Sequence, residues 1–124
     1  MYNRGYDPVV ATLQDFKADL FRALGHPTRI RILELLREQT TMTVGDLQQA
    51  LEIGAATTSQ HLSVLRSHAL VVARREGTSV RYEVRDPELY FLLDAARALF
   101  EKQLHAQAQL LEDAGPAGSE DALG

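Results

Sequence analysis

Apolar and polar residues follow one another along this chain with two different periods. Apolar residues spaced three and four positions apart predict helices over residues 7–24, 27–38, 44–51, 56–68 and 87–111. After the fourth of these, alternating apolar and charged residues predict two paired strands over residues 71–75 and 80–85. The pattern therefore predicts a mainly α fold with a small β-hairpin, in the order α-α-α-α-β-β-α.

Helix-capping residues support several of these boundaries. Asp7 before Pro8 combines an N-cap residue with a proline suited to the first helical position, and Asp86 before Pro87 repeats the combination. Thr43 starts a third helix with a carboxylate three residues further on, which is a capping-box arrangement. We expect a flexible arm over residues 1–7, one folded domain over residues 8–112, and a disordered tail over residues 113–124.

The segment over residues 43–84 organises the rest of the chain. Two short helices joined by a glycine-containing turn are typical of a helix-turn-helix, and the hairpin that follows would be its wing. Leu62 and Leu65 supply the buried side of the second helix, with Thr58 as a smaller filler. The residues expected to contact DNA are Ala56, Thr57, Thr58, Ser59, Gln60, His61, Ser63 and Arg66 on the second helix, and Arg74, Arg75, Thr78 and Arg81 on the hairpin.

The same residues could instead have purely structural roles. The polar side chains of the second helix could form a solvated face, and the hairpin arginines could be surface charge that protects an edge strand from aggregation. Arg66 is suited equally to a phosphate contact and to an ion pair, and His61 could be a packed residue. For the other histidines the plainer role is favoured: His26 as a cap or turn residue, His68 at a helix end, and His105 on a solvated face.

The distribution of charge favours a nucleic-acid partner, although the net charge is −4. Residues 56–85 hold five arginines against two glutamates, a balance of +3. Residues 86–124 hold eight acidic residues against two basic ones, a balance of −6. Positive charge therefore coincides with the predicted helix-turn-helix and wing, where phosphates would lie.

Several classes of protein are disfavoured by what the sequence lacks. It contains no cysteine, which excludes disulfides, thiolate metal ligands and a cysteine nucleophile. No segment has the apolar length of a membrane span or the apolar core of a signal peptide, so a cytoplasmic location without membrane contact is expected. No glycine-rich phosphate loop, His-Glu-x-x-His or Gly-x-Ser-x-Gly occurs, so we expect no enzyme, no catalytic residue and no cofactor.

The first and last predicted helices carry more apolar surface than a small helix-turn-helix core can cover. Exposed apolar surface of this size usually marks an interface. The simplest use is a homodimer through these two helices. Such a dimer would place two recognition helices on successive major-groove faces of a palindromic site.

Four stretches together resemble the ArsR/SmtB family of bacterial winged helix-turn-helix repressors. They cover residues 24–33, 44–47, 58–66 and 74–77, with Tyr82, and the likeness spans roughly residues 15–104 in unbroken order. The resemblance implies a dimer that binds an operator in its own promoter region, and repression that a signal relieves. No residue pattern identifies an inducer.

The resemblance also implies that the two common metal sites of the family are absent. One site uses cysteine in the stretch that matches residues 43–46, which here holds none. The other uses carboxylate and histidine ligands along the last helix. Asp86 and Glu88 match its first half, but the partner positions hold Leu99 and Lys102, which do not ligate a divalent cation at neutral pH.

Two other functions are open at this point. A winged helix can serve as a protein-interaction module, with the acidic C-terminal segment suited to a basic partner; the location of the positive charge argues against this. A repressor could also respond to metal through an atypical site of histidine and carboxylate ligands, such as His105 with Glu101.

Overall fold

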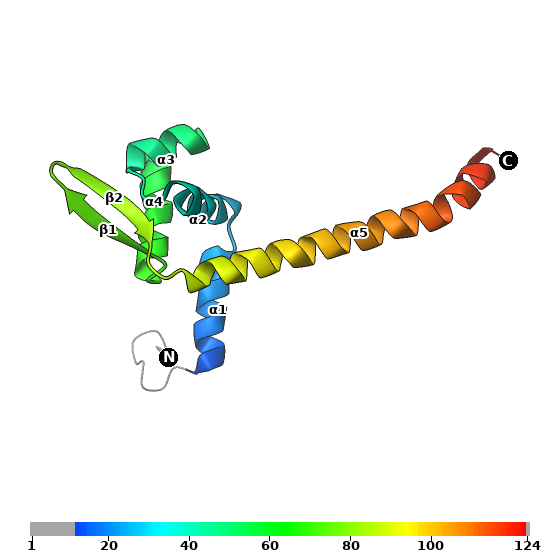
Figure 1. Cartoon of the computed structure of the whole chain (residues 1–124), viewed down its shortest axis with the longest axis horizontal. Coiled ribbons are helices and arrows are strands. Elements are labelled where there is room, and N and C mark those ends of the chain that lie inside the picture. The colour runs from blue at the N-terminus through cyan, green and yellow to red at the C-terminus, as the bar shows by residue number, and fades with distance from the viewer. Residues whose placement is uncertain (1–11, 124) are drawn as a thin grey trace. The chain divides into compact units, whose positions relative to one another are not determined.

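The computed structural model describes the backbone of residues 12–123 and the side chains of residues 12–114. Its elements, in chain order, are α1 (Leu13–Leu24), α2 (Pro27–Gln39), α3 (Val44–Leu51), α4 (Ala55–Ser67), β1 (Val71–Glu76), β2 (Ser79–Val84) and α5 (Glu88–Leu123) (Figure 1). The predicted order α-α-α-α-β-β-α is confirmed. The chain forms two units that divide after Asp86, the first holding α1 to β2 and the second holding α5.

The core of the first unit lies among α2, α3 and α4. Ile32, Leu33 and Leu36 of α2 are fully buried, because Leu36 lies three residues after Leu33 and four after Ile32, and both spacings share one side of a helix. Leu47 of α3 and the α4 leucines predicted from helical spacing, Leu62 and Leu65, complete the core. Each such side chain contributes about 1.5–3 kcal/mol to stability by leaving water. The cluster therefore holds α4 against α2 and α3.

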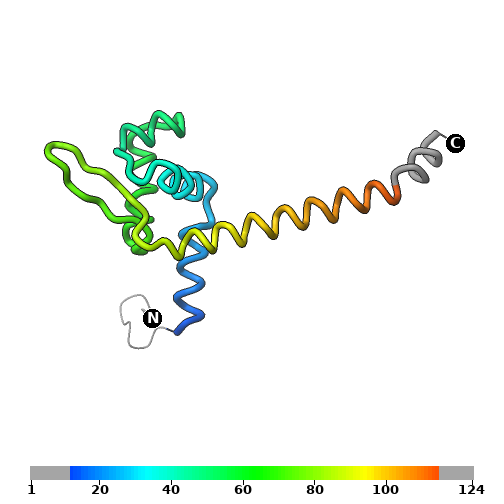
Figure 2. The backbone as a smooth tube through the Cα atoms, viewed as in Figure 1, coloured from blue at the N-terminus to red at the C-terminus, as the bar shows by residue number. Residues whose placement is uncertain are grey.

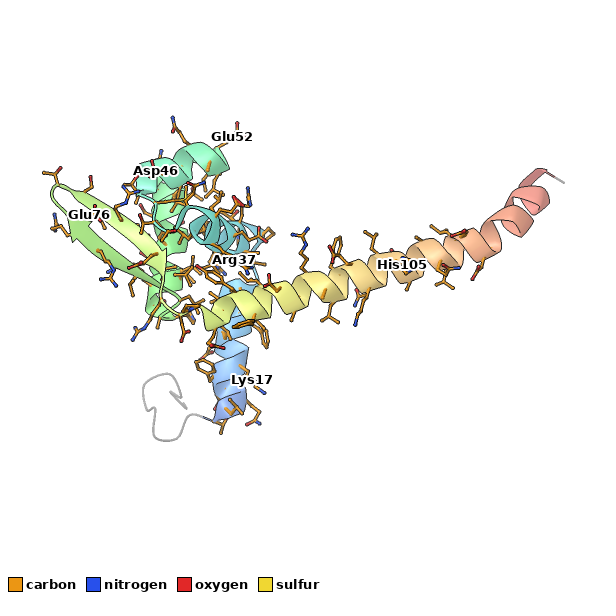
Figure 3. The ribbon with its side chains drawn as sticks, in the orientation of Figure 1. Lys17, Arg37, Asp46, Glu52, Glu76 and His105 are labelled. Carbon is orange, nitrogen blue, oxygen red and sulfur yellow. The ribbon has the colours of Figure 1, made fainter. Side chains whose placement is uncertain are left out.

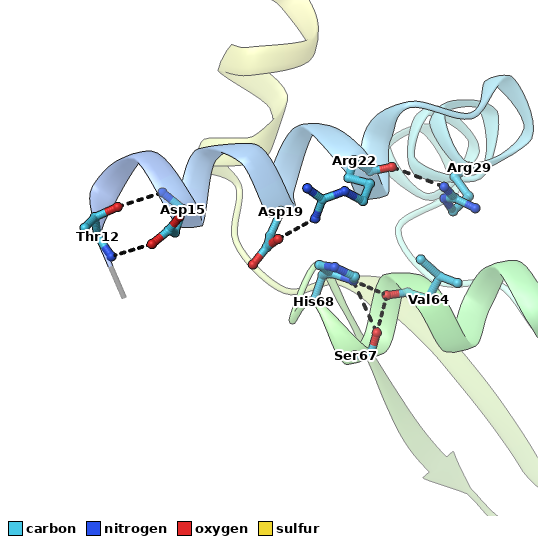
Figure 4. Close-up of polar contacts among 8 residues, drawn as sticks. All are labelled: Thr12, Asp15, Asp19, Arg22, Arg29, Val64, Ser67 and His68. Carbon is cyan, nitrogen blue, oxygen red and sulfur yellow. Dashed lines mark hydrogen bonds and ion pairs between the residues drawn. The ribbon is translucent and has the colours of Figure 1, made fainter. Parts of the chain in front are cut away.

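α1 begins later than the sequence suggested. Thr12 is extended (φ −88°, ψ 167°), its hydroxyl accepts from the Asp15 N–H at 3.0 Å, and the Asp15 carboxylate accepts from the Thr12 N–H at 3.3 Å (Figure 4). This reciprocal capping box satisfies two backbone donors and begins the helix at Leu13. The predicted start at residues 7–8 and the predicted flexible arm lie outside the described residues.

The same device starts α3, as the sequence predicted. The Thr43 hydroxyl accepts from the Asp46 N–H at 3.1 Å, and the Asp46 carboxylate accepts from the Thr43 N–H at 3.0 Å. The backbone and side-chain bonds to Thr43, and to a smaller degree the charge of Arg81, hold the pKa of Asp46 below its usual value of 3.8. The ionised carboxylate therefore stabilises the fold at neutral pH, and this contribution is lost as the solution becomes strongly acidic.

The hairpin pairs Val71 with Val84 and Glu76 with Ser79, which leaves a turn of two residues, Gly77 and Thr78. Gly77 has a φ of +61°, and positive φ at the first turn position matches the type II′ turn that suits the twist of paired strands. At its base, β2 also bridges to Met42. The Met42 N–H donates to the Tyr82 carbonyl at 3.1 Å, and the Tyr82 N–H donates to the Met42 carbonyl at 2.8 Å.

α5 is longer than predicted. It continues to Leu123, past the predicted end at Leu111, and the tube in Figure 2 follows its long course. Gly115 and Pro116 predict an earlier end, because proline removes a helical N–H donor. However, alanines, the strongest helix formers, flank this pair, and the backbone remains helical. The predicted disordered tail stays a prediction, since side chains beyond residue 114 lie outside the described part. Over the described residues, no helix combines the length and apolar character needed to cross a bilayer.

Candidate nucleic-acid interface

α3 and α4 form a helix-turn-helix whose second helix presents one polar face. The turn between them places Glu52 in the left-handed region (φ 57°, ψ 44°) and Gly54 at the N-cap of α4. On α4 the side chains of Thr57, Ser59, Gln60, Ser63 and Arg66 are exposed, and Ala56 lies beside them. None of these five polar side chains has a hydrogen-bond or ion-pair partner within residues 12–114. Their donors and acceptors are therefore available to an external ligand.

Thr58 is the exception on α4, and its predicted contact with DNA is wrong. Its side chain is fully buried and its hydroxyl donates to the Gly54 carbonyl at 2.9 Å. Positions four and seven residues further along the helix are Leu62 and Leu65, so Thr58 shares their core side. The alternative expectation, that Thr58 fills space in the core, is confirmed.

The surface around α4 has an excess of positive charge. No acidic residue occurs anywhere in residues 53–75, which include all of α4, while Arg66, Arg74 and Arg75 fall within the same span. Gly54 gives the helix no side-chain cap, so the N–H groups at the start of α4 are not bonded to a capping side chain. Partial positive charge at that end and the arginines both favour an anionic partner.

The three hairpin arginines have different surroundings. Arg75 is exposed and has no ion pair among the described side chains, and Thr78 is exposed in the turn. Arg74 forms an ion pair across the hairpin with Glu83. Arg81 is partly buried and donates from Nε to the Thr41 hydroxyl at 2.8 Å and from Nη2 to the Thr41 carbonyl at 3.3 Å. Arg81 thus joins β2 to the connector between α2 and α3, a contact 40 residues away in sequence that local patterns did not reveal.

His61 does not lie with the polar face of α4. Its ring is half-buried, 4.4 Å from the ring of His26 between centroids, and its Nδ1 lies 3.4 Å from Nη1 of Arg29. Burial, followed by the charges of His26 and Arg29, lowers the pKa of His61 from its usual 6.5. Position 61 lies one helical turn from Thr58 and Leu65, which accounts for its inward direction. The surroundings match the plainer role, a packed residue, and sequence reasoning missed Arg29 altogether.

The other histidines have separate surroundings. His26 caps α2, as predicted, with Nδ1 accepting from the Thr28 N–H at 3.2 Å. His68 bonds the Val64 carbonyl at 2.9 Å and contacts the Ser67 hydroxyl (Figure 4). His105 projects from the middle of α5 (Figure 3). Within the described residues, no three histidine, aspartate or glutamate side chains gather in a group that could hold a metal ion.

Each unit also carries an exposed apolar face. In the first unit, α1 exposes Phe16 and Phe21 by 61% and 54%. In the second, α5 exposes a stripe that includes Leu99, Phe100 and Leu104, where a shallow groove of about 380 Å³ is lined by Phe100, Leu104 and Leu110 with two glutamines. Large apolar side chains at this exposure are unusual on a surface that contacts only water.

A helix-turn-helix followed at once by a β-hairpin defines the winged helix class, and comparisons with known proteins agree. A family model described as a helix-turn-helix domain matches residues 24–74. The HTH-type transcriptional regulator Rv0081 of Mycobacterium tuberculosis is 39% identical over 108 residues, which are 86% of this chain and 94% of that protein. Its crystal structure matches with a TM-score of 0.72 at 38% identity, covering 77% of this chain and 96% of its own.

Two further relatives define the family. The HTH-type transcriptional repressor SmtB of Mycobacterium tuberculosis is 36% identical over 89 residues, 71% of this chain and 65% of its own length. The homodimeric winged helix-turn-helix DNA-binding domain of Mb0332 from Mycobacterium bovis matches with a TM-score of 0.67 at 32% identity, covering 74% of this chain and 84% of that one. The chain belongs to the ArsR/SmtB family of winged helix-turn-helix transcriptional regulators, which confirms the resemblance found in its sequence. These relatives are regulators of transcription, not enzymes.

Proposed function

We propose that this chain is a sequence-specific DNA-binding repressor that binds a palindromic operator as a homodimer and blocks transcription sterically. The observation that carries the proposal is the row of exposed, unpartnered polar side chains on α4 within an acid-free stretch of chain. Short polar side chains on a helix can reach base edges and phosphates when the helix lies in the major groove. A bacterial repressor acts where the DNA is transcribed, so the proposal includes a cytoplasmic location.

The exposed side chains suit different roles on DNA. Gln60 has both a donor and an acceptor at its end, which matches the adenine edge in the major groove. Thr57, Ser59 and Ser63 have shorter reach and suit phosphates or nearby base edges, and Arg66 suits a phosphate. On the wing, Arg75 and Thr78 are available for the DNA backbone or the minor groove, whereas Arg74 and Arg81 already have partners within the protein.

A second copy of the chain would cover the exposed apolar faces. We assign this role to the apolar sides of α1 and α5, and we assign DNA binding and dimerisation together to residues 8–112. The homodimeric state of the similar Mb0332 domain supports dimerisation. Two-fold symmetry would present two α4 helices to half-sites about 34 Å apart, one turn of DNA.

The proposal is tested by fluorescence anisotropy with the DNA upstream of the protein's own gene, against a scrambled fragment, at about 150 mM salt. We expect tight binding to the upstream fragment and weak binding to the scrambled one. Equal binding to both, followed by failure to enrich any sequence from random DNA, would refute it. Repeating the titration with Zn²⁺ and Ni²⁺ tests the atypical metal site, because an unchanged affinity is expected without one.

Replacing Arg75 with alanine is expected to weaken binding to specific and random DNA by similar factors. An arginine that neutralises a phosphate releases a counterion, so the slope of log K against log salt should become shallower by about 0.9 per protomer, or about 1.8 for a dimer. Titrations at several salt concentrations measure this slope. The matched control is Arg74→Ala, which removes an arginine already paired with Glu83 and should change the slope less. A sequence-dependent weakening in Arg75→Ala would instead make Arg75 a base contact.

A further inference from the structure

His26, Arg29 and His61 form a polar cluster where α4 meets the ends of α1 and α2. Arg29 is its centre. From α2 it donates through Nε to the Ala23 carbonyl at 2.6 Å. It also donates through Nη2 to the Arg22 carbonyl at 3.3 Å (Figure 4). Both carbonyls belong to the last turn of α1, where helices leave acceptors unsatisfied. The third nitrogen, Nη1, faces Nδ1 of His61 on α4, so a single guanidinium bridges α1 and α4.

The chemistry of this bridge fixes the state of the His61 ring. A guanidinium has donors only, so the hydrogen bond requires Nδ1 of His61 to be the acceptor and its proton to lie on Nε2. His26 is held in the same way, because its Nδ1 accepts from the Thr28 N–H. A second proton on the His61 ring would enter at Nδ1. It would convert the hydrogen bond to Arg29 into a contact between two cations.

No side chain among the described residues near the ring would compensate such a charge. Burial, His26 and Arg29 all lower the pKa of His61, and no carboxylate of the described residues acts on it. Several charged groups on the elements packed around α4 have partners elsewhere: Asp19 with Arg22 on α1, Arg31 with Glu34 on α2, Asp46 at the cap of α3, and Arg74 with Glu83 on the hairpin. Arg75 on the hairpin is unpaired among the described side chains, but it is itself a cation and would not compensate a charged ring. The neutral ring is therefore the form that fits this site.

We propose that His61 is a pH-sensitive positioning residue for the recognition helix α4, and that loss of its bond to Arg29 on acidification weakens specific DNA binding. This inference rests on the proposed DNA-binding function. The direction of the pH dependence follows from linkage, because the folded structure holds the pKa of His61 below its usual 6.5. The neutral ring therefore stabilises the position of α4 fully above pH 6.5, and this stabilisation is lost as the pH falls below that value. A histidine that contacts phosphate gives the opposite sign, because acidification then strengthens binding.

The test measures affinity for the upstream DNA fragment between about pH 7.5 and pH 5.5 at constant ionic strength. One proton per protomer limits the effect to about tenfold per pH unit for each protomer, and we expect binding at least about threefold weaker at the acid end. His61→Asn places a non-titrating oxygen near the position of Nδ1. This variant should bind like the wild type at the upper pH and lose most of the acid-induced weakening. The control is His105→Asn, which removes a histidine from the exposed surface of α5. This variant should still bind DNA more weakly in acid, as the wild type does.

Affinity that rises on acidification, with the rise abolished in His61→Asn, would overturn the proposal and make His61 a phosphate contact. An unchanged pH profile in His61→Asn would also overturn it. Measurements on the free protein separate this from failure of the proposed function. If no DNA is bound specifically at any pH, the proposed DNA-binding function fails. The role of His61 is then tested on the free protein by histidine NMR titration and by amide exchange of α4. The proposal expects His61 to titrate below an exposed histidine, and α4 amides to lose protection in acid relative to His61→Asn.

Discussion

Replacing Gln60 with alanine is expected to weaken binding to the cognate operator by about 1–3 kcal/mol while leaving binding to random DNA almost unchanged. Gln60 is exposed on α4, has no partner among the described residues, and is the longest uncharged polar side chain on that face. The substitution removes a bidentate hydrogen bond to a base, whereas it keeps the phosphate contacts that dominate random binding. Anisotropy titrations with both DNA fragments measure the difference.

The control for this experiment is Gln109→Ala, which makes the same change on α5, where Gln109 bonds Asp113. It should leave both affinities unchanged. Thermal unfolding of each variant checks that α4 remains folded. Equal weakening on cognate and random DNA for Gln60→Ala would show that Gln60 is a general contact and does not read bases.

Replacing Phe100 with glutamate is expected to dissociate the proposed dimer. The side chain is 62% exposed in the single chain, and burying it against a second copy would contribute about 1.5–3 kcal/mol per protomer. The substitution acts twice in a symmetric dimer, so the dimer dissociation constant should rise by about a hundredfold or more. Sedimentation velocity measures this change. Operator affinity should fall with it, since two half-sites are no longer bound by one linked molecule.

Ala98→Glu is the matched control. It adds the same charge two residues away on the opposite face of α5, and the new carboxylate lies four residues before Lys102, a favourable spacing. This variant should remain dimeric. A dimer that survives Phe100→Glu would move the interface away from this part of α5, and the exposed phenylalanines of α1 would be tested next.

The helix-turn-helix was predictable because its signals are local. The capping box joins Thr43 and Asp46, three positions apart, and the apolar positions of α4 repeat within two turns, so residue spacing alone places them. The same logic applies to Thr12 and Asp15, but the stronger Asp7–Pro8 signal drew the predicted start of α1 further back. Helical spacing also assigns Thr58 to the core, which conflicted with its inclusion among the predicted DNA contacts.

The residues that sequence reasoning missed act across long separations. Arg29 contacts His61 over 32 positions, and Arg81 contacts Thr41 over 40, and no local pattern encodes either partner. An arginine looks the same in sequence whether it faces phosphate or a carbonyl. Only the packing of α1, α2 and β2 distinguishes Arg75, which is available to DNA, from Arg29 and Arg81, which are engaged within the protein.

The attachment of the wing bears on the thermodynamics of recognition. Two backbone hydrogen bonds between Met42 and Tyr82, together with the contact from Arg81 to Thr41, tie β2 to the connector that leads into α3. The hairpin is thereby held by the same segment that holds the helix-turn-helix. Flexible loops that become ordered on binding lose conformational entropy, which reduces affinity. A wing ordered beforehand avoids that loss, so an arginine near its tip can contribute nearly all of its interaction free energy to the complex.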